Sequence, residues 1–186
     1  MGKVLIPLVE GFEEIEAVAP IDLLRRAGLE VVTAGVGSRQ VRGSHGIVVE
    51  ADALLADVVG DSFDLIMLPG GPGTRKLMDV AELQHALKAQ VAAGRSVAAI
   101  CAAPTVLAKA GLLRGRRVAC FPAVEDELVG ATVVREDVVI DGNMITSRGA
   151  GTSIPFALAI IAHLCGQAKA EEVARSVVYR GAMQVQ

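Results

Sequence analysis

The residue best suited to covalent chemistry in this sequence is Cys101, which directly follows an apolar run at residues 96–100. Two small residues and Pro104 come next, and a proline suits the first turn of a helix, where its missing N–H group costs nothing. A thiol at such a strand-to-helix turn is exposed by the bend, and the free N–H groups of the helix lower its pKa. Free cysteines after buried strands are also commonly small core residues. The local pattern alone therefore leaves both interpretations open.

A group of carboxylates, Glu13, Glu14 and Glu16, crowds the start of a predicted helix near the N-terminus. Glu13 and Glu14 suit this place because negative charge compensates the helix dipole. Glu16 lies one turn after Glu13, close to the apolar side of the helix. If Glu16 is buried, desolvation keeps it protonated at neutral pH. A protonated carboxyl group beside a thiolate can donate a hydrogen bond or transfer a proton.

A glycine-rich loop, Pro-Gly-Gly-Pro-Gly at residues 69–73, follows another apolar run. It lacks the Gly-Lys-Ser/Thr ending of a phosphate-binding loop and the third glycine of a dinucleotide-binding loop. Glycines here instead permit close approach of the backbone to the thiol. We expect the amides of Gly70 and Gly71, together with the amide of Ala102, to form an oxyanion hole.

The other candidate groups are not required at this site. His85 and His163 lie on predicted helices away from the sheet edge, whereas His45 lies on a loop that can reach it. A Cys–His pair is therefore poorly supported. Cys120 and Cys165 are interpreted as structural or incidental thiols. The three cysteines lack metal-ligand spacing, and an odd number opposes a disulfide framework, so we expect no metal and no cofactor.

Composition narrows the class of protein. The 186 residues are 52% hydrophobic with a mean hydropathy of +0.49. The sequence nevertheless contains no uninterrupted apolar stretch of about 18 residues, so we expect no membrane span. The N-terminus lacks the pattern of a signal peptide, so we expect a cytoplasmic protein. A net charge of −3 and 3% aromatic residues argue against nucleic-acid binding.

Alternating apolar strands and helices must position these groups. Strands are expected at residues 4–8, 30–34, 47–49, 64–68, 96–100, 117–121, 132–134, 138–140 and 144–146. Helices are expected at residues 13–27, 80–93, 103–110, 153–164 and 171–179. Pro20 predicts a kink or restart in the first helix, and Thr152 or Ser153 is expected to cap the fourth.

This alternation predicts βαβ units and one α/β domain over residues 1–186 with a mostly parallel, doubly wound sheet. Loops 9–16, 69–73 and 101–104 follow strand ends, so they should converge at the carboxyl edge, where such sheets form their sites. The helix at 153–164 is apolar on nearly every face, which indicates full burial or a subunit contact.

Several motifs, taken in order, resemble the DJ-1/ThiJ/PfpI superfamily, and specifically its DJ-1-like branch. They are Glu-Glu-Ile-Glu at 13–16, Arg-Arg-Ala-Gly at 25–28, Leu-Pro-Gly-Gly at 68–71, Ala-Ala-Ile-Cys-Ala-Ala-Pro at 98–104 and Thr-Ser-Arg-Gly-Ala-Gly-Thr at 146–152. The resemblance covers essentially the whole chain.

The resemblance implies a flavodoxin-like three-layer sandwich that forms homodimers. It implies that Cys101 is a nucleophile in a strained elbow and that Glu16 is the buried acid that hydrogen-bonds it. Gly71 and Ala102 match the amides that face the sulfur. Two departures matter: Ala102 stands where the protease-like branch has a histidine, which opposes a peptidase, and Phe121 stands where many DJ-1-like members place a histidine. A peripheral redox cysteine of some members corresponds to Glu50.

Three functional hypotheses follow. The first is a cofactor-free, cysteine-dependent enzyme of the glyoxalase III or deglycase type that converts a small aldehyde such as methylglyoxal to lactate. The second is a redox sensor or stress-protection chaperone whose Cys101 is oxidised to a sulfinate without significant turnover. The third is a purely structural or interaction protein, which fits the apolar helix but does not explain the cysteine elbow together with the glycine loop.

Overall fold

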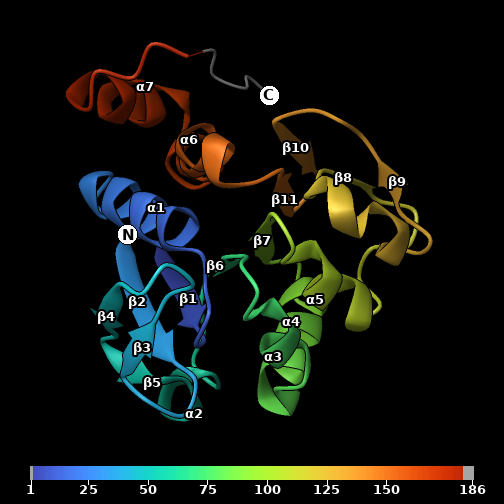
Figure 1. Cartoon of the computed structure of the whole chain (residues 1–186). Helices are drawn as coiled ribbons and strands as arrows, with labels where there is room; N and C mark the ends of the chain where they lie inside the picture. Colours follow the sequence, from blue (N-terminus) through green and yellow to red (C-terminus); the bar gives the residue numbers. More distant parts are fainter. Residues whose placement is uncertain (1, 182–186) are drawn as a thin grey trace.

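The computed structural model describes residues 2–181 and shows one seven-stranded sheet with helices on both faces (Figure 1). The strands are β1 (Lys3–Leu8), β2 (Glu30–Gly35), β3 (Gln40–Arg42), β4 (Val48–Glu50), β5 (Ala53–Leu54), β6 (Leu65–Leu68), β7 (Ser96–Ile100), β8 (Arg117–Val118), β9 (Thr132–Val133), β10 (Val138–Asp141) and β11 (Met144–Ser147). The helices are α1 (Glu14–Arg26), α2 (Leu55–Val58), α3 (Thr74–Met78), α4 (Ala81–Ala92), α5 (Pro104–Lys109), α6 (Ser153–Cys165) and α7 (Gln167–Ser176).

The order of the main sheet is β10-β11-β7-β6-β1-β2-β5, and only the β10–β11 pair is antiparallel. The central strands β1, β6 and β7 are apolar and almost wholly buried, as parallel strands covered on both faces must be. These three neighbours end at the same edge. The predicted α/β architecture with a mostly parallel sheet is therefore confirmed.

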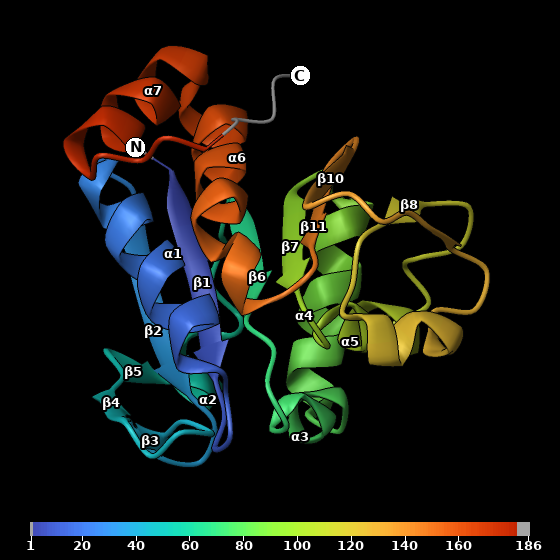
Figure 2. The same ribbon diagram turned by 45° about the horizontal axis from the view of Figure 1, so that its top comes forward.

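Two apolar cores separate the layers. One core packs α1, α6 and α7 against one face of the sheet, and the other packs α3, α4 and α5 against the opposite face (Figure 2). Helix α6 is covered along most of its length, although Ile154 near its start is 38% exposed. Within residues 2–181, no helix is both long enough and apolar enough to cross a membrane.

Several local predictions were wrong. Of the kink or restart predicted at Pro20, the restart is wrong, because α1 is one continuous helix from Glu14 to Arg26 with Pro20 buried inside it. The strand expected at residues 117–121 ends at Val118. Thr152, one of the two residues predicted as the cap, is the N-cap residue of α6, but its side chain forms no capping bond to that helix. The Oγ1 atom of Thr152 bonds instead with the backbone of Gly149, and the buried hydroxyl of Ser153 has no partner among the described residues.

Candidate active site

Cys101 forms the elbow between β7 and α5. Its φ angle is +63°, in the left-handed region that non-glycine residues rarely adopt. Its amide donates to the carbonyl of Ser147 at 3.0 Å, and its own carbonyl accepts from the amide of Phe121 at 2.9 Å. Such backbone strain costs about 1–3 kcal/mol and persists where the surroundings enforce it. The half-buried thiol in this strained turn favours the reactive interpretation over a simple core cysteine.

Glu16 lies directly against this elbow. Its side chain is 1% exposed, hydrogen-bonds Cys101, and accepts from the amide of Gly70 through Oε2 at 2.9 Å. The carbonyl of Gly70 in turn accepts from the amide of Glu13 at 2.9 Å, and Glu13 accepts from the amide of Glu16 at 2.8 Å. The start of α1 and the loop after β6 are thus joined by a closed set of hydrogen bonds around the acid.

The backbone amides of Gly71 and Ala102 lie near the sulfur of Cys101, where they act to lower the pKa of its thiol. Gly71 has a φ angle of +100° and lies so close to Glu13 and Gly11 that a side chain has no room. The structure places Glu16, Gly71 and Ala102 around Cys101. The expectation for the third amide was wrong, because the N–H group of Gly70 points to Glu16 rather than to the oxyanion position.

Burial and charge control the protons of this pair. Burial, aided by the charge of Glu13, raises the pKa of Glu16 to about 7. Burial and the neighbouring Glu16 carboxylate raise the pKa of Cys101 to about 12, although the amides of Ala102 and Gly71 act to lower it. The lowered thiol pKa expected from the helix end is therefore wrong, because burial and Glu16 outweigh the amides. Between these pKa values, Glu16 and Cys101 share one proton.

We predict that alkylation of Cys101 speeds up with rising pH through about 7 and then levels off, because the pair loses its first proton there. The Glu16 carboxylate formed there can accept the thiol proton as the sulfur attacks the reagent. The variant Glu16→Gln should lack this inflection, since an amide cannot accept the thiol proton. The measurement is the rate of iodoacetamide labelling at Cys101 from pH 5 to 9, followed by peptide mass spectrometry.

Glu82→Gln, at an exposed position on α4, is the matched control and should keep the wild-type profile. His45 borders the same cavity, and hydrogen bonding to Glu14 raises its pKa above the ordinary value, so a profile alone cannot assign the inflection. An inflection near pH 7 that survives in Glu16→Gln would show that Glu16 does not control the thiol.

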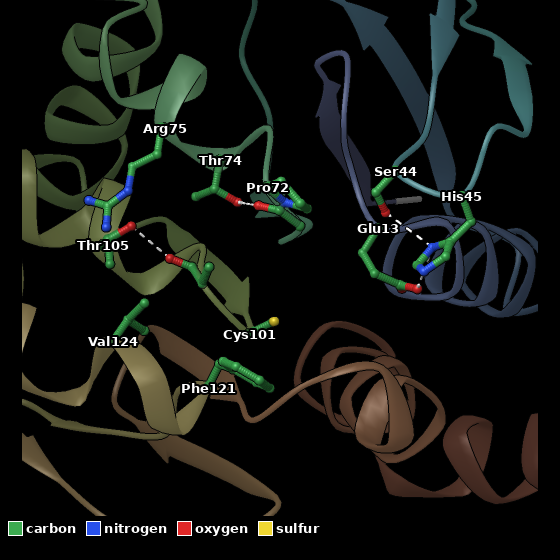
Figure 3. Close-up of a pocket in the computed structure, with 12 residues that line it drawn as sticks. Glu13, Ser44, His45, Pro72, Thr74, Arg75, Cys101, Thr105, Phe121 and Val124 are labelled. Carbon is green, nitrogen blue, oxygen red and sulfur yellow. Dashed lines mark hydrogen bonds and ion pairs between the residues drawn. The ribbon is translucent and has the colours of Figure 1, made fainter.

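The thiol opens into a cavity of about 480 Å³ (Figure 3). Its walls are formed by Glu13, Ser44, His45, Gly71, Pro72, Thr74, Arg75, Ala102, Thr105, Phe121 and Val124. Arg75 at its border forms a two-point ion pair with Glu127, with both N–O distances 2.6 Å. The lining is largely apolar with a few polar groups, as in sites for small organic molecules.

Several residues of this cavity were not expected from the sequence. The sequence places His45 on a loop that can reach the site without requiring it there, and His45 lines the same cavity as Cys101. Arg75 follows the glycine loop on α3, a helix that the sequence analysis did not predict. The only sequence signal for Arg75 is a polar residue close behind a loop at a strand end. For His45, a place on a loop does not determine in which direction the side chain points.

The other histidines and cysteines lie elsewhere. His163 hydrogen-bonds the hydroxyl of Ser96 at 2.8 Å, and burial lowers its pKa. His85 borders a different depression on α4. Cys120 is buried in the core and Cys165 is exposed at the end of α6. None of these four side chains lines the cavity at Cys101.

A metal site is not assigned. Glu13, Glu14 and His45 each offer an atom of a ligand type within 4.8 Å of the others. The hydrogen bond between Glu14 and His45, and the cap that Glu13 forms on the amide of Glu16, account for this arrangement.

Comparison with known proteins identifies the family and the fold of this chain. The model of the DJ-1/PfpI family matches residues 2–163. Protein DJ-1 homolog B of Arabidopsis thaliana is 44% identical over 182 residues, 96% of this chain and 42% of that protein, so the chain spans less than half of that relative. Glutathione-independent glyoxalase DJR-1.2 of Caenorhabditis elegans is 40% identical over 168 residues, 89% of either chain. The crystal structure of Drosophila melanogaster DJ-1beta superposes with a TM-score of 0.93 at 39% identity, covering 97% of this chain and 99% of that one.

Proposed function

We propose that this chain, which belongs to the DJ-1/PfpI family, uses Cys101 to convert small reactive aldehydes such as methylglyoxal into 2-hydroxy acids without a cofactor. The observation that carries the proposal is the strained thiol at a cavity wall, bonded to a buried acid and lying near two backbone amides. The nematode relative is named a glyoxalase, and a Pyrococcus abyssi relative, 35% identical over 151 residues, is named a deglycase.

The first step is addition of the thiol to the aldehyde carbon. The sulfur of Cys101 forms a bond to C1, the carbonyl oxygen becomes an alkoxide, and the thiol proton passes to Glu16. The amides of Gly71 and Ala102 lie beside the sulfur, where they can stabilise that developing charge. Protonation of the alkoxide gives a hemithioacetal that keeps the C1 hydrogen.

The second step moves a proton within the bound substrate. Glu16 in its carboxylate form removes the C1 hydrogen as a proton, which gives an enediolate with the negative charge on the C2 oxygen. The hydroxyl proton on the C1 oxygen moves to the C2 oxygen, and the protonated carboxyl group of Glu16 returns its proton to C2. C1 is thereby oxidised to a thioester and C2 is reduced to an alcohol, so no external oxidant or reductant takes part. A pKa of about 7 suits a group that must accept and return a proton near neutral pH. Water then hydrolyses the thioester to lactate and restores the thiol.

The test is lactate formation by the purified chain from methylglyoxal, with no glutathione, metal or nucleotide added. We expect lactate from the untreated protein. We also expect its loss after peroxide has oxidised Cys101, with the oxidised site established by peptide mass spectrometry. Failure to form lactate, or a rate that stays unchanged when the Cys101 thiol is consumed, would overturn the proposal.

The same geometry favours a second candidate function, a redox sensor in which Cys101 is the oxidised group. Two equivalents of peroxide convert the thiol to a sulfinic acid and release two molecules of water. The amides of Gly71 and Ala102 and a protonated Glu16 are donors that can hold the sulfinate oxygens. Two added oxygens at Cys101 before any change at Cys120 or Cys165, in a protein that forms no lactate, would support this function. Oxidation spread over the three thiols would oppose it.

A further inference from the structure

Outside the cysteine and its acid, a second organised polar pair lies at the cavity: His45 lines it, and the buried Glu14 supports His45 from beneath the surface. The carboxyl group of Glu14 is 5% exposed, although Glu14 begins a surface helix. It accepts from the backbone amide of His45 through Oε1 at 2.7 Å and contacts Nδ1 of the ring through Oε2 at 3.0 Å. The hydroxyl of Ser44 adds a bond to Oε2 at 3.2 Å. The amide of Ile47 is the fourth donor to Glu14, at 3.4 Å. Three of these bonds fix the loop on Glu14, and the bond to Nδ1 orients the imidazole ring.

These bonds also determine which ring nitrogen of His45 carries the proton. Burial alone opposes ionisation of Glu14, but hydrogen bonds from the His45 ring, its own amide and the amides of His45 and Ile47 bring its pKa down to about 2. An ionised carboxylate only accepts hydrogen bonds, so Nδ1 of His45 is the protonated nitrogen. The neutral imidazole therefore has its free lone pair on Nε2.

The imidazole of His45 is accessible to a small molecule or to water. Its side chain is 72% exposed, and it lines the same cavity as Cys101 (Figure 3). Among residues 2–181, no group forms a hydrogen bond to Nε2. Across the cavity, Phe121 offers no group for proton transfer. Glu16 is bonded to Cys101 and Gly70, and the proposed reaction already uses it for proton transfer between C1 and C2.

We propose that His45 is the general base that activates water for hydrolysis of the acyl group on Cys101, and that Glu14 is the residue that positions it. This inference rests on the proposed function. A water proton passes to Nε2 while the water oxygen forms a bond to the thioester carbon. The carbon–sulfur bond then breaks, the 2-hydroxy acid leaves, and the sulfur takes up the proton from the imidazolium. A base oriented by a carboxylate is a recurrent arrangement in acyl transfer, and here the base lines the cavity into which the nucleophile opens.

The test separates acylation of Cys101 from hydrolysis in the variant His45→Gln. We expect the first addition of methylglyoxal to proceed at the wild-type rate and kcat for lactate to fall about 100-fold or more, since a general base contributes at least that much. A lactoyl group should accumulate on Cys101. It has the mass of one methylglyoxal, persists on dilution and is released by hydroxylamine, whereas a hemithioacetal of the same mass dissociates on dilution. His85→Gln, outside this cavity, should match the wild type.

Two further measurements distinguish catalysis from structural support. Imidazole added to His45→Ala should restore part of the turnover, which a purely structural role does not predict. Turnover should also rise with pH as His45 loses its proton. Two charged groups face the His45 ring, the carboxylates of Glu13 and Glu14 at the start of α1. Arg42, on the strand that precedes His45, bonds the carbonyl of Gly46. Removing the Glu14 charge in Glu14→Gln should move both the rise and the NMR titration of the His45 ring to lower pH.

The outcomes are distinct. If the wild type forms lactate through Cys101 while His45→Gln keeps the wild-type kcat and accumulates no acyl group, the role of His45 is overturned and the proposed function stands. If the wild type forms no lactate through Cys101, both are overturned. Accumulation of the acyl group with rescue by imidazole supports both.

Discussion

Replacing Cys101 with serine is expected to lower lactate formation from methylglyoxal by about 1000-fold or more, in line with removal of nucleophiles elsewhere. A serine hydroxyl is far less acidic than a thiol, and Glu16, with a pKa of about 7, is too weak a base to ionise it. The backbone donors at Gly71 and Ala102 remain, so the loss reports the nucleophile rather than the surrounding site. Steady-state rates with methylglyoxal give the measurement.

The control for this variant is Cys165→Ser, because Cys165 is exposed at the end of α6 and away from the cavity. It should keep the wild-type rate. Serine is nearly isosteric with cysteine, so the thermal unfolding curves of both variants should match that of the wild type. Measuring these curves verifies that each variant is folded. A Cys101→Ser protein that is folded and retains more than a tenth of the rate would rule out covalent catalysis at this residue.

The sheet and the convergence of the site were accessible from the sequence for one physical reason. Buried parallel strands appear as continuous apolar runs, and the loops that follow neighbouring strands must meet at the carboxyl edge. Strand β7 was predicted with the bounds that the structure has. The positions of Glu16 and Gly71 beside Cys101 follow from the order β7-β6-β1 in the sheet.

What the sequence did not reveal depends on contacts between distant segments. The pKa of Cys101 illustrates this, because the local argument considered only the helix end and omitted burial and the charge of Glu16. The place of His45 depends on the turn between β3 and β4 and on bonds to Glu14, 31 residues away. Helix α3 is a single short segment with too few residues for a periodic pattern.

The substitution Gly71→Ala is expected to lower the free energy of unfolding by about 3 kcal/mol and to suppress turnover. A Cβ atom at this position would lie 2.5 Å from the amide nitrogen of Glu13 and 2.6 Å from the carbonyl oxygen of Gly11. Both are backbone atoms and cannot rotate away. The loop must therefore shift, which moves the Gly71 amide from the sulfur of Cys101 and loosens the attachment of the loop to α1.

Gly37→Ala separates this steric effect from the cost of the backbone angle alone. Gly37 has a φ angle of +75°, but its Cβ atom would meet nothing within 4 Å. The Gly37→Ala substitution should lower the free energy of unfolding only by the strain of the left-handed backbone angle, about 1–2 kcal/mol, and should leave turnover unchanged. Urea unfolding of both variants, with methylglyoxal turnover measured in parallel, makes the comparison. Equal destabilisation with equal activity would mean that close packing around Gly71 does not hold the amide at the sulfur. A larger loss in Gly71→Ala, accompanied by slower alkylation of Cys101, would show that the glycine loop and the reactive thiol are one structural unit.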